Sequence, residues 1–118
     1  MPWSLRQVSG QQEYQSIREK DGALATIGLW WYVDPSKFTP NKGTAANGQC
    51  VCVVLPPGGA AGWFYPYHVY QNNQQWTVEG DWPNVTITPS INCPGYYHGW
   101  IRDGQITDDC EGRVFNGQ

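Results

Sequence analysis

Four side chains in this sequence are of types that commonly bind zinc. Thiolate and imidazole are the ligands that a closed tetrahedral zinc site prefers. The four candidates are Cys50, Cys52, Cys93 and His98, and turns beside three of these positions would help the side chains converge. Cys110 is a further candidate. Free cysteines are also common as small buried apolar residues. The sequence therefore leaves two readings open: a structural zinc site built from this set, or a protein without a cofactor.

Cys93 and His98 also have the residue types of a thiol nucleophile and its base, with Asp108 or Asp109 to orient the imidazole. No helix begins at Cys93, so nothing in the sequence would lower the pKa of its thiol. Paired carboxylates for hydrolysis or for a hard cation could come from Asp103, Asp108, Asp109 and Glu111, although acidic turns are usually only solvated. With no triad order, phosphate loop or His-rich motif evident, the sequence predicts a protein that is not an enzyme.

Aromatic residues interleaved with amides dominate the stretch between residues 63 and 100. Tyr and Trp stack on planar or sugar rings, and amides hydrogen-bond the ring edges. We therefore expect a groove that holds a nucleotide, a sugar or a host protein surface, lined by Trp63, Tyr65, Tyr67, His68, Trp82, Trp100 and Arg102. The same rings could instead fill the core, or form an interface between copies of the chain in a virion structural or assembly protein. A zinc-stabilised structural module is the third alternative.

The charge pattern restricts the partners. The net charge is −3, and no basic face is evident that could follow a duplex backbone. No apolar run approaches the roughly 20 residues of a membrane helix, and the first residues lack the order of a signal peptide. The sequence therefore predicts no duplex nucleic acid and no membrane, and a place in the cytoplasm (the host cytoplasm, if the protein is viral) or in a virion.

The elements that would position these side chains are mostly short strands. The chain has 118 residues, which we interpret as one domain spanning 1–118, and its 14 Gly and 9 Pro leave little room for long helices. One helix is expected at 11–20, with Ser9 as its cap and Gly22 at its end. Strands are expected at 26–33, 49–55 and 84–88, and hairpins join 63–70 to 75–79 and 98–102 to 105–107. We predict a mainly β fold: a single-domain antiparallel β-sandwich or small open barrel with one short N-terminal helix.

Residues 76–106 contain a tryptophan strand, the run Thr86-Ile-Thr-Pro-Ser-Ile91, then Cys93, His98 and the hairpin Trp100-Ile-Arg-Asp-Gly-Gln-Ile106. This stretch resembles a small uncharacterised family of phages and prophages that is sometimes labelled ammonia monooxygenase. In that family a cysteine-rich knuckle precedes the tryptophan strand and looks like a metal site completed by the later Cys and His. Here residues 55–60 carry no sulfur, so the metal is absent or Cys50 and Cys52 replace the knuckle. The resemblance implies a phage-type accessory protein.

Overall fold

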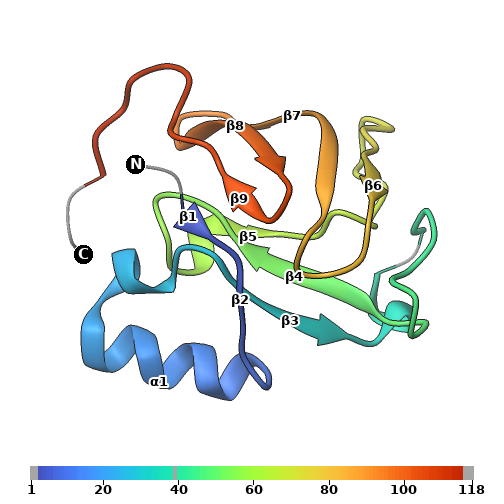
Figure 1. The fold of residues 1–118 in the computed structure, drawn as a ribbon, viewed down its shortest axis with the longest axis horizontal. Helices are drawn as coiled ribbons and strands as arrows, with labels where there is room; N and C mark the ends of the chain where they lie inside the picture. Colours follow the sequence, from blue (N-terminus) through green and yellow to red (C-terminus); the bar gives the residue numbers. More distant parts are fainter. Residues whose placement is uncertain (1–2, 39, 116–118) are drawn as a thin grey trace.

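The computed structural model describes residues 3–38 and 40–115, which form two β-sheets and one α-helix near the N-terminus (Figure 1). The five-stranded sheet, called sheet A here, has the order β1-β9-β8-β7-β6, and the four-stranded sheet B has the order β2-β3-β4-β5. All strand pairs are antiparallel except β2 with β3. The predicted mainly β class with one short N-terminal helix is confirmed.

Sheet B is enclosed on both faces. Its strands are β2 (Arg6–Gln7), β3 (Leu29–Val33), β4 (Cys50–Val54) and β5 (Trp63–Phe64). One face packs against the helix α1 (Gln11–Asp21) through a cluster made of Val8, Tyr14, Leu29, Trp31, Cys52 and Val54. The other face contributes to the main core. All five residues of β4 are therefore buried, as expected of a strand whose sequence is a continuous apolar run.

Sheet A covers the main core with one face only. Its strands are β1 (Trp3–Ser4), β6 (Thr77–Glu79), β7 (Thr86–Cys93), β8 (Tyr97–Arg102) and β9 (Gln105–Ile106). Its inward side chains enter the same core as those of sheet B and include Ile87, Ile91, Tyr97, Ile101 and Ile106. Along β8, fully buried residues alternate with partly or fully exposed ones. The outer face of sheet A is therefore accessible.

Three short 3-10 helices connect these elements: η1 (Ala23–Thr26), η2 (Pro35–Lys37) and η3 (Ala60–Gly62). The predicted helix is found, although Ser9 does not cap it: the backbone N–H of Ser9 instead donates to the Glu13 carboxylate at 2.7 Å. The predicted hairpin that joins 98–102 to 105–107 is also found. Asp103 and Gly104 turn it with φ angles of 48° and 75°, which is the conformation that an Asp-Gly pair favours.

The other predicted hairpin, between 63–70 and 75–79, is wrong. β5 pairs with β4 in sheet B, whereas β6 pairs with β7 in sheet A, so the segment between them crosses from one sheet to the other. The reason is that Pro66 interrupts the first run, and a local turn closes between Tyr70 and Gln74, with Asn73 at a positive φ. Among the described residues no helix has the length and apolar character needed to cross a membrane.

Candidate active site

The structure does not bring together the four side chains considered as zinc ligands. Cys50 lies in the main core and Cys52 in the cluster beneath α1, while His98 lies on the outer face of sheet A. Within residues 3–38 and 40–115, no three His, Cys, Asp or Glu side chains are placed to hold a metal ion. The predicted zinc set is therefore not brought together, because Cys50 and Cys52 are buried among apolar residues of sheet B, away from the outer face of sheet A that carries His98.

The predicted aromatic groove is not assembled either. Trp63 packs beneath α1 against Tyr14 and Trp31, whereas Tyr67 is buried and its hydroxyl accepts a hydrogen bond from the Trp82 indole at 2.9 Å. Tyr65 and His68 both contact Phe38, and His68 also lies beside Tyr70, whereas Arg102 lies over Trp100 on sheet A. These rings mostly serve the two cores, because each one finds neighbouring rings close to its own position in the chain or sheet.

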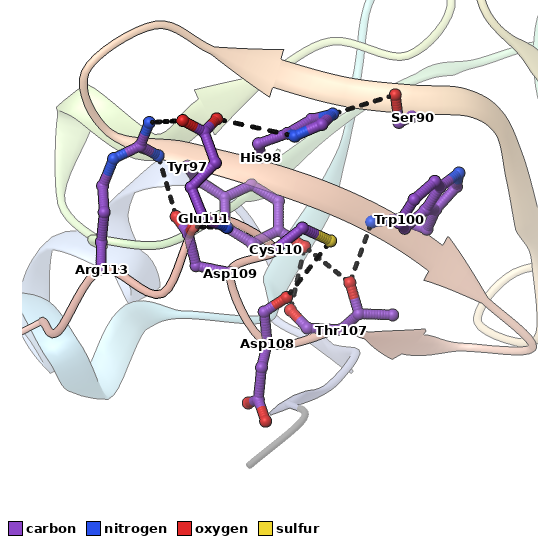
Figure 2. A network of polar contacts seen from close by, with 10 residues as sticks. All are labelled: Ser90, Tyr97, His98, Trp100, Thr107, Asp108, Asp109, Cys110, Glu111 and Arg113. Atoms are coloured by element: carbon purple, nitrogen blue, oxygen red, sulfur yellow. Dashed lines mark hydrogen bonds and ion pairs between the residues drawn. The ribbon is translucent and has the colours of Figure 1, made fainter.

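A different set of polar side chains meets on the outer face of sheet A (Figure 2). The hydroxyl oxygen of Ser90 lies 3.2 Å from Nε2 of His98. On the other side of the same ring, Nδ1 lies 3.6 Å from Oε2 of Glu111. A serine, a histidine and a carboxylate in this order form the arrangement that activates a serine nucleophile. The Glu111 distance is longer than a hydrogen bond, and such contacts are often loose before substrate binds.

The pairing of β7 with β8 explains why Ser90 faces His98. Asn92 is the cross-strand partner of His98, and Ser90 lies two residues earlier on β7. Because side chains alternate along a strand, Ser90 and His98 share the outer face and are diagonal neighbours. The site is open to solvent, since the His98 side chain is 32% exposed and that of Glu111 is 51% exposed.

Ser90 lies in an irregular part of β7. Between Ile87 and Ile91 the register shifts, so that three residues of β7 oppose the single residue Trp100 of β8. Pro89, which cannot donate a ladder hydrogen bond, is tolerated in such a bulge. The indole of the buried Trp76 donates to the Ser90 carbonyl at 3.4 Å. Bulges of this kind often re-aim a side chain beside an active site.

Glu111 reaches His98 from the segment that follows β9. The backbone N–H of Cys110 donates to the His98 carbonyl at 2.8 Å, which fixes this segment against β8. Thr107 fixes its beginning, because its hydroxyl accepts from the Trp100 N–H at 3.0 Å and its carbonyl accepts from the Tyr97 hydroxyl at 2.9 Å. The segment is thus hydrogen-bonded to β8 at Thr107 and again at Cys110, immediately before Glu111.

Cys93, which the sequence offered as a thiol beside His98 without predicting catalysis, does not face it. Cys93 is paired with Tyr97, one position away from the Asn92–His98 pair, so its side chain points to the opposite side of the strand. Burial raises the pKa of the Cys93 thiol, which keeps it protonated and a poor nucleophile. The sequence therefore named His98 among reactive residue types, but the thiol considered beside it lies on the other side of β7.

Ser90 is not among the residues predicted from the sequence, and Glu111 was considered only as part of a solvated acidic turn. Ser90 was visible only as part of the Thr-Pro-Ser-Ile run, and a Pro inside an alternating strand was the one local signal of a bulge there. Glu111 lies 13 residues after His98 in an acidic turn. Nothing in its spacing showed that the turn folds back onto β8.

Comparison with known proteins bears directly on this site. A family model described as BubE, bacterial ubiquitination-like system serine protease, matches residues 37–108, which is more than half of the chain. The match contains the region of the resemblance described above, together with Ser90 and His98, and it ends before Glu111. No curated protein and no solved structure matches. The predictions of a non-enzymatic binding protein, and of a protein that is not an enzyme, are wrong, because the matching family is one of serine proteases.

Proposed function

Because this chain belongs to the BubE family of bacterial ubiquitination-like system serine proteases, we propose that it hydrolyses peptide bonds with Ser90 as the nucleophile. His98 is the general base and Glu111 orients it. The observation that carries this assignment is the continuous contact from Ser90 Oγ to His98 Nε2, at 3.2 Å, and from His98 Nδ1 to the Glu111 carboxylate, at 3.6 Å.

The geometry supports the usual sequence of proton transfers. With its proton on Nδ1, facing the carboxylate, His98 presents the lone pair of Nε2 to the Ser90 hydroxyl. Ser90 Oγ forms a bond to the substrate carbonyl carbon as its proton moves to Nε2. The imidazolium then gives that proton to the leaving amine as the C–N bond breaks. Water repeats the sequence on the acyl-enzyme, which releases the acid and restores the serine.

The surroundings of Ser90 favour a macromolecular substrate. The site lies on an accessible sheet face, beside the indole of Trp100 and the guanidinium of Arg102, whose Cζ is 4.8 Å from the Trp100 ring centroid. An extended polypeptide segment can lie across such a face. Since the family description refers to a ubiquitination-like system, we propose that the substrate is a ubiquitin-like protein, cleaved at a bond within its tail or at its attachment to another protein.

The test is covalent labelling with a fluorophosphonate, which reacts with activated serines. We expect one labelled residue, Ser90, identified by peptide mass spectrometry. Ser90→Ala removes the label, whereas Ser36→Ala, a change of the same size at an exposed serine in η2, retains it. Persistent labelling of Ser90→Ala, or no labelling of the wild-type protein, would refute the assignment.

A further inference from the structure

Arg113 contacts the Glu111 carboxylate at the oxygen that does not face His98, and Asp109 in turn holds Arg113. Nη2 of Arg113 lies 3.1 Å from Oε1 of Glu111, while Oε2 of the same carboxylate faces His98. Nη1 of Arg113 donates to Oδ2 of Asp109 at 2.9 Å. The guanidinium therefore joins the two carboxylates, as Figure 2 shows.

Asp109 is the fixed point of this arrangement. Its side chain is only 1% exposed, and its Oδ1 accepts the backbone N–H of Glu111 at 2.7 Å. One carboxylate thus holds both the backbone of Glu111 and the guanidinium that contacts the Glu111 side chain. A half-exposed glutamate would otherwise sample several rotamers, so these contacts restrict it to the orientation that faces His98.

The charges of these three side chains also favour this role for Glu111. Asp109 and Glu111 each carry a negative charge at neutral pH and Arg113 a positive one, so the three together retain a net charge of −1. Because Asp109 neutralises the guanidinium, Glu111 keeps a full charge for the imidazolium that forms at His98. Without Asp109, Arg113 would compete with His98 for Glu111.

We propose that Asp109 and Arg113 are positioning residues of this active site, which act by holding the Glu111 carboxylate against His98. The inference rests on the proposed function, and it assigns a purpose to a segment that lies almost wholly beyond the region matched by the family model. Neither residue touches Ser90, so any effect on the reaction passes through Glu111.

The experiment measures the rate of fluorophosphonate labelling at Ser90, separated into the maximal rate and the half-saturating concentration. We expect Glu111→Gln to lower the maximal rate about 100-fold, and Asp109→Asn or Arg113→Gln to lower it about 10-fold without changing half-saturation. Arg113→Lys should restore part of the rate, because it keeps the charge but loses the two-pronged contact. Matched controls on α1, Asp21→Asn and Lys20→Gln, should leave the rate unchanged.

The decisive measurement repeats these substitutions in the Glu111→Gln background. If Asp109 and Arg113 act through Glu111, Asp109→Asn and Arg113→Gln change the residual rate by less than about 2-fold there. Equal losses in both backgrounds would overturn the inference, since they would indicate a general structural effect. So would full labelling rates in Arg113→Gln, a partly exposed position where substitution should not prevent folding. Loss of the proposed function has a separate signature, which is labelling that survives Ser90→Ala.

Discussion

The two sheets of this protein contain similar reactive side chains but place them in opposite environments. In sheet B, β4 lies between α1 and the main core, and Cys52 is fully buried. In sheet A, β7 and β8 bury only one face, and the other presents Ser90 and His98. A strand covered on both faces, such as β4, leaves none of its side chains able to meet a substrate, whereas a sheet covered on one face can stabilise the fold and carry chemistry at the same time.

The contrast extends to the regularity of the strands. β4 pairs with β3 in an unbroken register over four residue pairs, which suits a strand whose role is packing. β7 has its register shift beside Ser90, the proposed nucleophile. Irregular backbone is therefore concentrated where a side chain has to be aimed, and regular backbone where apolar area has to be buried.

The largest expected effect comes from removing the nucleophile on the open face. Ser90→Ala should lower hydrolysis by about 1,000-fold or more, because neither His98 nor Glu111 can substitute for it. The melting temperature should stay close to that of the wild type, since only a partly exposed hydroxyl is lost. Peptide-bond hydrolysis and thermal unfolding, measured on the same preparation, test both parts. If Ser90→Ala lost activity only because it unfolds, the proposed difference between sheet A and sheet B would be wrong.

The opposite behaviour is expected for the enclosed sheet. Leu29 is 1% exposed in the cluster beneath α1. Leu29→Ala should lower the free energy of unfolding of the protein by about 2–5 kcal/mol. Below the melting temperature, the labelling rate of Ser90 per folded molecule should be unchanged. Urea titration gives the first quantity and fluorophosphonate kinetics the second. A large loss of labelling in the folded variant would show that sheet B also tunes the site.

Alkaline pH should destabilise the fold through buried groups in both sheets, Cys52 in sheet B and Tyr97 on the inner face of sheet A. Burial raises the pKa of Cys52 from 9.0 to about 12 and that of Tyr97 from 10.0 to about 12. The unfolded chain therefore releases these protons first, and rising pH favours unfolding. The contribution of Cys52 is intact below pH 9 and decreases by about 1.4 kcal/mol for each pH unit between 9 and 12. Urea unfolding at pH 8, 9 and 10 measures this, and Cys52→Ala should flatten the dependence.

The smallest effect concerns the thiols. Cys110 is exposed, whereas Cys50 and Cys52 are buried, so iodoacetamide should modify Cys110 first in the folded protein. Cys93→Ala should change the labelling rate of Ser90 by less than about 2-fold, because its thiol points away from His98. Mass spectrometry during alkylation and the labelling assay check these statements. A strong loss of activity in Cys93→Ala would contradict this prediction and indicate that the Cys93 thiol takes part in the reaction.

Local features of the sequence were sufficient for much of the fold. The β-branched run at 49–55 predicted a strand, Asp103 and Gly104 predicted the hairpin between β8 and β9, and Gly22 predicted the end of α1. Each of these depends on residues adjacent in the chain. The failed hairpin between 63–70 and 75–79 shows the limit, because two strands close in sequence were separated by their better packing in different sheets.

The active site was much less predictable, since its members are brought together by pairing and by a returning loop. His98 was identified as a reactive type from the sequence, but its partner depends on the register between β7 and β8, which places Ser90 diagonally across from it. Glu111 depends on a backbone hydrogen bond between Cys110 and His98.

The sequence by itself determined which residues are apolar enough to be buried, where the chain turns and which side chains could react, because these are properties of single residues and their immediate neighbours. The tertiary structure alone decided which sulfurs became inert and which serine meets the histidine. Those outcomes depend on strand register and on whether one or both faces of a sheet are covered, and both are fixed only when distant segments pack together.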